Sequence, residues 1–262
     1  MNTQENSVGK PLANANWLQA HHNAKLPERI AFAKMLAELT PKSIVDLGCA
    51  TGLWLEVLNE YMPEDCEFIG IDADDEVLRI ALEKSKKWKR KVTFLRMDLE
   101  KDVCRIPSSD ITLAFNVFPY IQNLDDFLNI LSNRVPKGKL IVRQYDGASI
   151  RFGPMPTAER QKMESDLRLS TEGSQKFKHY DLDRTFSSIY RSNYTNIKCS
   201  FELFERTSPF PESFIPYYNG TLDWTLQNLS ETSATKLKKW INQGDQLSNR
   251  YFFEVDLVAI LS

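Results

Sequence analysis

Short β-branched runs alternate with amphipathic helical stretches through the first half of the chain, and this alternation limits the fold more than any other feature. The strand-like runs lie at residues 43–47, 67–72, 92–97, 110–115 and 139–143. Strands that alternate with helices pair into a mostly parallel sheet, and the helices cover both of its faces. The sequence therefore predicts a three-layer α/β sandwich.

The second half of the chain is less regular but adds two more strands. A helix is predicted at 182–194, a strand at 196–206 and a last strand at 251–261. Two insertions, at 147–179 and 207–249, interrupt this half with polar and aromatic helical stretches. We therefore expect a seven-stranded sheet with helical cap insertions beside it.

The length and the composition favour one domain. The chain has 262 residues, of which 42% are hydrophobic and 26% charged, values ordinary for a single globule with a substantial core. We expect a flexible tail at 1–15 and one domain at 16–262. The predicted cap elements of that domain lie at about 16–40, 147–179 and 207–249.

The charge balance offers no global field for a polyanion or a membrane surface. The 33 Lys and Arg residues nearly cancel the 35 Asp and Glu residues, which leaves a formal charge of -2. One basic run, from Lys84 to Lys91 with Trp88 inside it, is typical either of nucleic-acid binding or of a solvated helix C-terminus. We favour the helix end and expect no nucleic-acid partner.

The cysteines and the N-terminal run indicate an intracellular protein. The four cysteines form no C-x-x-C pair, so they fit reduced thiols in the cytoplasm better than a zinc site or a disulfide framework. The run from Met1 to Lys10 has no apolar segment of the signal-peptide kind, and no stretch of about 20 apolar residues occurs elsewhere. We expect a soluble, cytoplasmic protein without a membrane partner.

The loop after the first strand, residues 46–52 with the sequence DLGCATG, is the expected ligand site. In an open α/β sheet, ligands bind beyond the carboxyl ends of the strands. Gly48 and Gly52 let a ligand approach the backbone, and the following helix directs free N–H groups and its positive dipole end at that ligand. The spacing differs from both the dinucleotide fingerprint G-x-G-x-x-G and the P-loop.

The same loop resembles the D-x-G-x-G-x-G motif of class I S-adenosylmethionine-dependent methyltransferases, with Ala50 in place of the middle glycine. Asp72, Asp98 and Asn116 follow later strands at the places where that family binds its cofactor. The resemblance covers residues 43–145 well and the later strands in outline. It implies a Rossmann-like sheet with an antiparallel last strand. It also implies S-adenosyl-L-methionine as cofactor, with S-adenosyl-L-homocysteine as the product.

The resemblance assigns each residue to a part of the cofactor. Asp72 accepts hydrogen bonds from the ribose hydroxyls, and Asp98 accepts from the adenine amino group. Ala73 lies against the adenine, Leu99 offers its backbone N–H, and Asn116 lines the methionine arm. The residues predicted to bind the cofactor are Arg29, Asp46, Gly48, Cys49, Ala50, Gly52, Asp72, Ala73, Asp98, Leu99 and Asn116. A structural alternative stays open, because aspartates at strand ends often cap turns.

The N-terminal segment supplies the candidates for a general base. In-line methyl transfer depends on positioning, and a base helps only when the acceptor carries a proton that must leave. Of the three histidines, His21 and His22 lie in a segment that folds over the cofactor in many small-molecule members of the family. Arg29 is predicted to pair with the cofactor's carboxylate. The alternative places these three side chains on a solvated surface. No metal site is expected, because adjacent histidines point to different sides of a helix.

The acceptor side of the site is predicted from aromatic residues. Residues 116–120 (NVFPY) lack the [DN]-P-P-[YFW] motif of enzymes that methylate amino groups of nucleic-acid bases, so that chemistry is not supported. The predicted substrate-binding residues are Trp17, Tyr120, Tyr145 and Arg151. Other large residues of the insertions either cover an organic acceptor or pack the caps onto the core. These are Phe152, Met155, Phe210, Phe214, Tyr217, Tyr218 and Trp224.

The sequence therefore predicts an S-adenosylmethionine-dependent methyltransferase that acts on a small organic molecule, a group that includes enzymes tailoring secondary metabolites. Two alternatives remain open. One is a methyltransferase for a protein or an RNA, and the other is a cofactor-binding partner subunit without activity. The acceptor atom, and the choice between a monomer and a homodimer, do not follow from the sequence.

Overall fold

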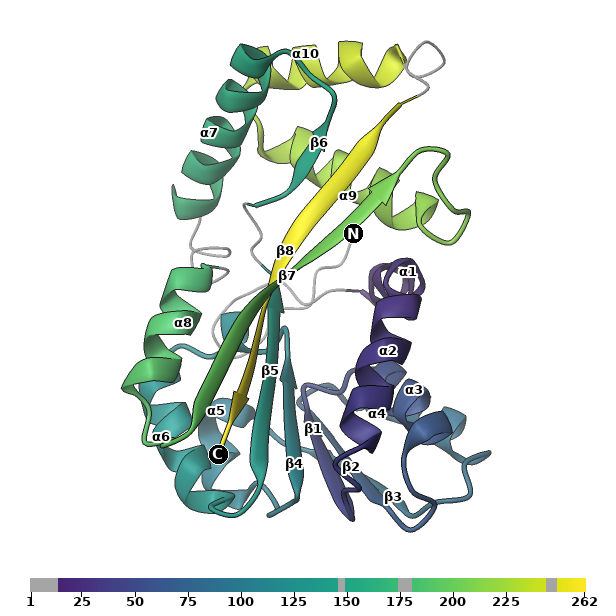
Figure 1. Ribbon diagram of the computed structural model, residues 1–262, viewed down its shortest axis with the longest axis vertical. Coiled ribbons are helices and arrows are strands. Elements are labelled where there is room, and N and C mark those ends of the chain that lie inside the picture. Colours follow the sequence, from purple (N-terminus) through teal and green to yellow (C-terminus); the bar gives the residue numbers. More distant parts are fainter. Residues whose placement is uncertain (1–13, 146–148, 174–180, 244–248) are drawn as a thin grey trace.

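The computed structural model describes residues 14–145, 149–173, 181–243 and 249–262. In these residues eight strands form one sheet in the order β3-β2-β1-β4-β5-β8-β6, with β7 paired to β8 off this path (Figure 1). The strands are β1 (Ser43–Leu47), β2 (Glu67–Asp72), β3 (Val92–Arg96), β4 (Ile111–Phe115), β5 (Lys139–Tyr145), β6 (Arg151–Gly153), β7 (Ile197–Thr207) and β8 (Tyr251–Leu261). β1 to β5 run parallel, and β8 is antiparallel to β5, β6 and β7. The predicted Rossmann-like α/β sandwich with an antiparallel last strand is confirmed.

β6 makes the sheet one strand larger than the seven strands expected. This strand has three residues and pairs Arg151 with Phe253 and Gly153 with Tyr251. Such a run is too short to show the alternation on which a strand prediction depends. Its position is instead set by β8, which extends far enough to pair with it.

The centre of the sheet is apolar because both of its faces are covered. Ile44, Val45 and Leu47 of β1 are fully buried, and so is Leu113 of β4. Strands buried on both faces read as continuous β-branched and aliphatic runs rather than as alternating ones. For this reason the buried strands can be recognised in the sequence as short, continuous apolar runs.

Helices cover both faces of the parallel strands. One layer holds α2 (Leu26–Ala37), α3 (Leu53–Tyr61) and α4 (Asp75–Ser85), and the other holds α5 (Leu99–Asp102), α6 (Leu124–Arg134) and α8 (Leu182–Arg191) (Figure 1). Leu36 and Leu55 pack against the sheet from the first layer, and Leu128 and Ile189 from the second. Two separate hydrophobic cores therefore flank the sheet.

β7 and β8 continue past the carboxyl ends of the parallel strands and carry a cap. Residues 256–261 of β8 pair with β5, whereas residues 251–253 pair with β6. Around the outer part of these strands lie α7 (Thr157–Gly173), α9 (Ile215–Asn228) and α10 (Glu231–Asn242) (Figure 1). The cap has its own core, in which Phe152, Phe214 and Phe252 are fully buried.

α1 (Ala15–Ala24) connects this cap with the parallel sheet. Asn14 caps the helix by accepting a hydrogen bond from the Trp17 N–H at 2.9 Å. α1 packs against α9 at Gly220, where an added Cβ would lie 2.4 Å from the Trp17 ring. The helix begins at Ala15, so the tail predicted for 1–15 ends earlier, and residues 1–13 of it lie outside the described residues.

The basic run lies at the C-terminus of α4, where the sequence predicted it. Lys84, Lys86 and Lys91 form ion pairs with acidic neighbours at 2.7–3.3 Å. Arg90 donates to four backbone carbonyls, among them that of Pro63 at 2.9 Å. These bonds attach the end of the basic run to the end of α3 and the segment that follows it. In the described part of the chain, no helix combines the length and apolar character needed to cross a bilayer.

Candidate functional site

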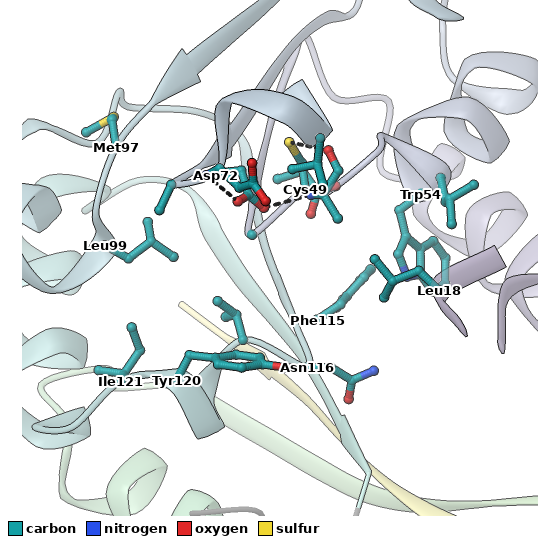
Figure 2. A pocket seen from close by; sticks show the side chains of 18 of the residues that line it. Leu18, Cys49, Trp54, Asp72, Met97, Leu99, Phe115, Asn116, Tyr120 and Ile121 are labelled. Carbon is teal, nitrogen blue, oxygen red and sulfur yellow. Dashed lines mark hydrogen bonds between the residues drawn. The ribbon is translucent and has the colours of Figure 1, made fainter. Parts of the chain in front are cut away.

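A cavity of about 250 Å³ opens at the carboxyl ends of β1, β2, β4 and β5. Asp46, Asp72, Asn116 and Tyr145 line it from the ends of these strands or from the residue that follows. Figure 2 shows Asp72 and Asn116 among them. α1 forms its outer wall through Trp17 and other residues. The cavity therefore lies where an open α/β sheet binds its ligand.

The loop at residues 46–52 folds through three left-handed residues. Gly48 has a φ of 68°, Ala50 of 46° and Gly52 of 74°. At Gly48 an added Cβ would also lie 2.9 Å from Val117 Cγ2, so glycine is required there by space as well as by conformation. Ala50 adopts the same conformation with a side chain, at a cost of roughly 1 kcal/mol. Gly52 caps α3 and is not part of the cavity lining.

Asp72 is fixed by this loop in an orientation that leaves oxygen lone pairs for a ligand. Its Oδ2 accepts the Ala50 N–H at 2.9 Å, and its Oδ1 accepts the Asp74 N–H at 3.0 Å (Figure 2). Burial raises the pKa of Asp72, and these backbone donors oppose the shift. A carboxylate has about four acceptor positions, so these backbone bonds leave acceptor capacity for a ligand hydroxyl group.

Asp46 lies deeper in the cavity and is almost completely buried. Burial, followed by repulsion from Asp72, raises the pKa of Asp46 to about 8, although Arg29 opposes the shift. The carboxyl group is therefore mostly protonated at neutral pH until a cation arrives beside it.

Arg29 is a buried cation that lacks an ion-pair partner. Its guanidinium lies 4.8 Å from the centre of the Trp54 ring, and its NH1 group is 2.7 Å from His22 Nδ1. Within the described residues no carboxylate lies at ion-pair distance from it, and burial lowers its pKa to about 10. A buried guanidinium without a counter-ion is costly, so this end of the cavity fits a ligand carboxylate.

Asp98 and Asn116 line the cavity but also shape the backbone. Asp98 caps α5 by accepting the Glu100 N–H at 3.1 Å, and it pairs with Lys101 at 2.9 Å. Asn116 has a φ of 56° and accepts the Tyr145 N–H at 3.1 Å through Oδ1. Both predicted roles, cofactor contact and turn formation, are compatible with these positions.

The two adjacent histidines point to different surroundings. His21 lines the cavity, and its buried Nε2 has no hydrogen-bond partner in the part of the chain that the structure describes. Its ring stacks on Tyr217 with 5.2 Å between centroids, and Tyr145 lies edge-on at 6.2 Å. Burial, with Lys25 and Arg29 adding to it, lowers the pKa of His21 well below its usual value, so the ring is neutral. His22 is not among the lining residues, which contrasts with its predicted place at the reacting centre.

Of the four residues predicted to bind the substrate, three line the cavity and one does not. Trp17, Tyr120 and Tyr145 line the cavity. Arg151 does not, because its Nε binds Glu164 at 3.0 Å and its guanidinium lies over Phe253 at 5.2 Å. Its assignment to the substrate is therefore corrected to a contact inside the cap. Large residues of the insertions, Phe152, Phe214, Tyr217 and Tyr218, are buried in the cap core and do not line the cavity either.

Sequence patterns also missed a buried ionic network behind His21. Lys25, between α1 and α2, pairs with Glu254 and with Asp256, the latter at 3.2 Å. Arg143 reaches Asp256 at 3.0 Å, and the Tyr217 hydroxyl donates to Glu254 at 2.6 Å. The detectable signal was the pair of acidic residues at alternate positions of an otherwise apolar strand, since buried carboxylates require partners.

Other lining residues were missed because they are apolar or adjoin the residues that carried the motif. They are Leu18, Leu53, Trp54, Asp74, Val77, Met97, Glu100, Phe115, Val117 and Ile121. Met97, Leu99 and Ile121 lie together at one end of the cavity (Figure 2). An apolar end of this kind suits a flat ring system, while Arg29 and Asp46 occupy another part of the lining.

Comparison with known proteins finds a methyltransferase domain and structural neighbours that share the fold. Residues 44–138 match the family model described as a methyltransferase domain. The YcgJ protein of Bacillus subtilis superposes with a TM-score of 0.53 at 14% identity, over 90% of this chain and 97% of that one. A Haemonchus contortus phosphoethanolamine N-methyltransferase in complex with S-adenosylhomocysteine gives 0.51 at 15% identity, over 90% of this chain and 52% of that one. The plantazolicin methyltransferase BpumL gives 0.50 at 19% identity, over 94% and 88%. No curated protein sequence matches the chain.

Residues 44–138 match a methyltransferase domain, and the chain shares its Rossmann-like fold with methyltransferases that were solved with S-adenosylhomocysteine. The cofactor of such a domain is S-adenosylmethionine. The residues of the cavity fit that molecule, because an unpaired guanidinium, a carboxylate with free acceptor positions and an apolar end all line one space.

Proposed function

We propose that this methyltransferase acts on a small, uncharged organic molecule and that His21 takes a proton from the acceptor. When bound, S-adenosylmethionine supplies an electrophilic methyl group to a nucleophile held in line with it. The observation that carries the proposal is the neutral His21 ring, which lines the cavity and whose Nε2 has no hydrogen-bond partner among the described residues. When the ring proton is on Nδ1, such a nitrogen can accept a hydrogen bond from a hydroxyl or N–H group of the substrate.

We further propose how the chain holds the cofactor. Arg29 binds the carboxylate, Asp72 accepts from the ribose hydroxyls, and the apolar end near Leu99 holds the adenine. Asp98, Asn116, Ala73 and Cys49 also line the cavity and are proposed to contact the cofactor. The left-handed conformations of Gly48 and Ala50, both of which line the cavity, support this assignment because they bring the loop backbone close to the ligand.

The charges around His21 favour an uncharged acceptor. Lys25 and Arg143 are neighbours of His21, but both are already paired with buried carboxylates. Because carboxylates of the chain pair with these cations, neither of them is left for an acidic substrate. Trp17, Tyr120 and Tyr145 offer aromatic faces to a neutral organic molecule. BpumL and the phosphoethanolamine enzyme are named for different small acceptors, so the fold does not restrict the choice.

A labelled-donor screen tests the acceptor class. Purified protein is incubated with methyl-labelled S-adenosylmethionine and with metabolite, protein and RNA fractions of the same cells. We expect label in the metabolite fraction. Label confined to protein or RNA would support the alternative methyltransferase, and cofactor binding without turnover on any fraction would support an inactive partner subunit.

Two variants then test the residues. His21→Asn lowers kcat by about 100-fold while the affinity for S-adenosylhomocysteine stays within a factor of two, because a base acts on the acceptor alone. Asn23→Ala, on the exposed side of the same helix, is the matched control and leaves kcat unchanged. Asp72→Ala weakens S-adenosylhomocysteine binding by tenfold or more in calorimetry, and unchanged affinity would refute the ribose role.

We also propose a cytoplasmic location, a single domain over the described chain from residue 14, and either a monomer or a homodimer as the working form. The four cysteines support the location, because all of them are free thiols, as expected in a reducing compartment. The packing of α1 against α9, and the pairing of β8 with both β5 and β6, support the single domain. Sedimentation of the purified chain distinguishes the two oligomeric states.

A further inference from the structure

His22 makes a contact that the proposed function does not yet use. The residue lies in the last turn of α1 and is 6% exposed, and Arg29 lies in α2 and is 8% exposed. The distance from Arg29 NH1 to His22 Nδ1 is 2.7 Å. Because an arginine nitrogen can only donate, Nδ1 is the acceptor, and the proton of the neutral ring is on Nε2.

This contact explains why His22 does not serve as the base. A general base needs a free lone pair within reach of the substrate, but the lone pair of Nδ1 is taken by Arg29 and Nε2 carries a proton. His22 is also absent from the cavity lining, whereas Arg29 belongs to it. Burial, followed by repulsion from Arg29, lowers the pKa of His22 to about 3, so the acceptor persists at neutral pH.

Two aromatic side chains restrict the Arg29 guanidinium from different directions. The indole of Trp54 lies against it at 4.8 Å, and Trp54 is itself packed on Phe115 at 4.6 Å between centroids. The His22 ring binds one N–H group at the edge of the guanidinium. A stacked face and one fixed edge determine the plane and rotation of the group, and the remaining N–H groups are left for a ligand.

We propose that His22 is a positioning residue that orients Arg29 for the carboxylate of the cofactor's methionine arm. The inference rests on the proposed role of Arg29. A planar fork binds a carboxylate through two parallel hydrogen bonds only when its orientation is correct, so a fixed guanidinium loses less entropy on binding. His22 therefore selects cofactors that carry the carboxylate and does not take part in the proton transfer at His21.

A matched pair of amide variants tests this role. In His22→Asn the amide oxygen occupies the place of Nδ1, and in His22→Gln the same group lies one bond farther out, near the place of Nε2. Calorimetry measures the Kd of each variant for S-adenosylhomocysteine and for S-adenosyl-3-thiopropylamine, which lacks only the carboxylate. We expect His22→Gln to weaken S-adenosylhomocysteine by about tenfold and the amine by less than twofold. His22→Asn stays within threefold of wild type for both.

Kinetics supply a second readout. In His22→Gln the KM for S-adenosylmethionine rises by a similar factor while kcat at saturation is retained, because a positioning residue for the cofactor does not change the proton transfer. Equal losses for both ligands, or no loss for either, would overturn the inference and leave His22 with a packing role. If the wild type itself does not prefer S-adenosylhomocysteine over the amine, the proposed role of Arg29 fails instead, independently of the variants. Should His22→Gln fail to fold, His22→Leu, which fills the space without an acceptor, gives the same comparison.

Discussion

Replacing Asp46 by asparagine should remove a specific part of the pH dependence of stability. Asp46 is almost completely buried, and burial and Asp72 raise its pKa to about 8 in the folded state. In the unfolded chain its pKa is about 3.9. A group whose folded pKa is raised contributes stability that is complete below the unfolded pKa and is lost as the pH rises through the folded pKa. The ligand-free wild type is therefore expected to weaken steadily between about pH 4 and pH 8.

The magnitude follows from the proton count. Between the two pKa values the folded protein holds one proton at Asp46 and the unfolded chain holds none, which corresponds to about 1.4 kcal/mol per pH unit. From pH 6.0 to pH 7.5 this amounts to about 2 kcal/mol of unfolding free energy. His21 and His22 have lowered pKa values and act in the opposite direction. Asp46→Asn retains both histidines, so the difference between the two proteins isolates Asp46.

Urea denaturation at constant ionic strength measures the effect. The unfolding free energies of wild type and Asp46→Asn are determined at several pH values from 6.0 to 7.5, without cofactor. The wild-type value should fall relative to the variant by about 2 kcal/mol over this range. Parallel curves for the two proteins would show that Asp46 is ionised in the folded state, and the reasoning from burial and repulsion would be wrong.

Three other changes have defined outcomes. Binding of S-adenosylhomocysteine at pH 7 should release close to one proton in the wild type and none in Asp46→Asn, because the ligand's ammonium group favours the ionised form of the Asp46 carboxyl. Calorimetry in buffers of different ionisation enthalpy measures this proton release. Gly48→Ala should lower the unfolding free energy by about 1–2 kcal/mol, because alanine would have to adopt a φ of 68° against Val117; an unchanged urea midpoint would contradict this. Tyr217→Phe should cost about 1–3 kcal/mol, because the buried Glu254 loses a donor, and thermal unfolding would show a lower Tm.

The parallel half of the fold and the cofactor side of the cavity were predictable because their signals are local. Each strand is a short buried run, and Asp46, Asp72 and Asn116 are identified by their position at a strand end. The carboxyl ends of parallel strands meet at one edge, so residues far apart in the sequence converge without any knowledge of packing. Ala50, which replaces the middle glycine of the family motif, is also a local feature, because the loop sets its left-handed conformation.

The acceptor side was not predictable to the same degree because long-range packing determines it. Arg151 carries a charge that suited a substrate, but β8 extends far enough to pair with its strand, and Glu164 lies within reach of it. The sequence does not distinguish His21 from His22, because both are histidines in the same predicted helix. The side chains of successive helix residues point about 100° apart around the helix axis. Which of them meets the cavity depends on how α1 packs against α9, at the glycine that accommodates Trp17.

Several residues proposed for the site lie outside the matched domain. The family model covers residues 44–138, whereas His21, Arg29 and Tyr145 precede or follow it. Lys25 lies where α1 ends and α2 begins, and it is paired to carboxylates of the last strand. Lys25 therefore lies between the helix that carries the proposed base, His21, and the helix that carries Arg29, the residue proposed to bind the cofactor's carboxylate. The carboxylates that hold Lys25 in place come from β8, at the opposite end of the chain. Because the family model does not cover these residues, the match to it does not reveal the substrate of this enzyme, which has to be determined by experiment.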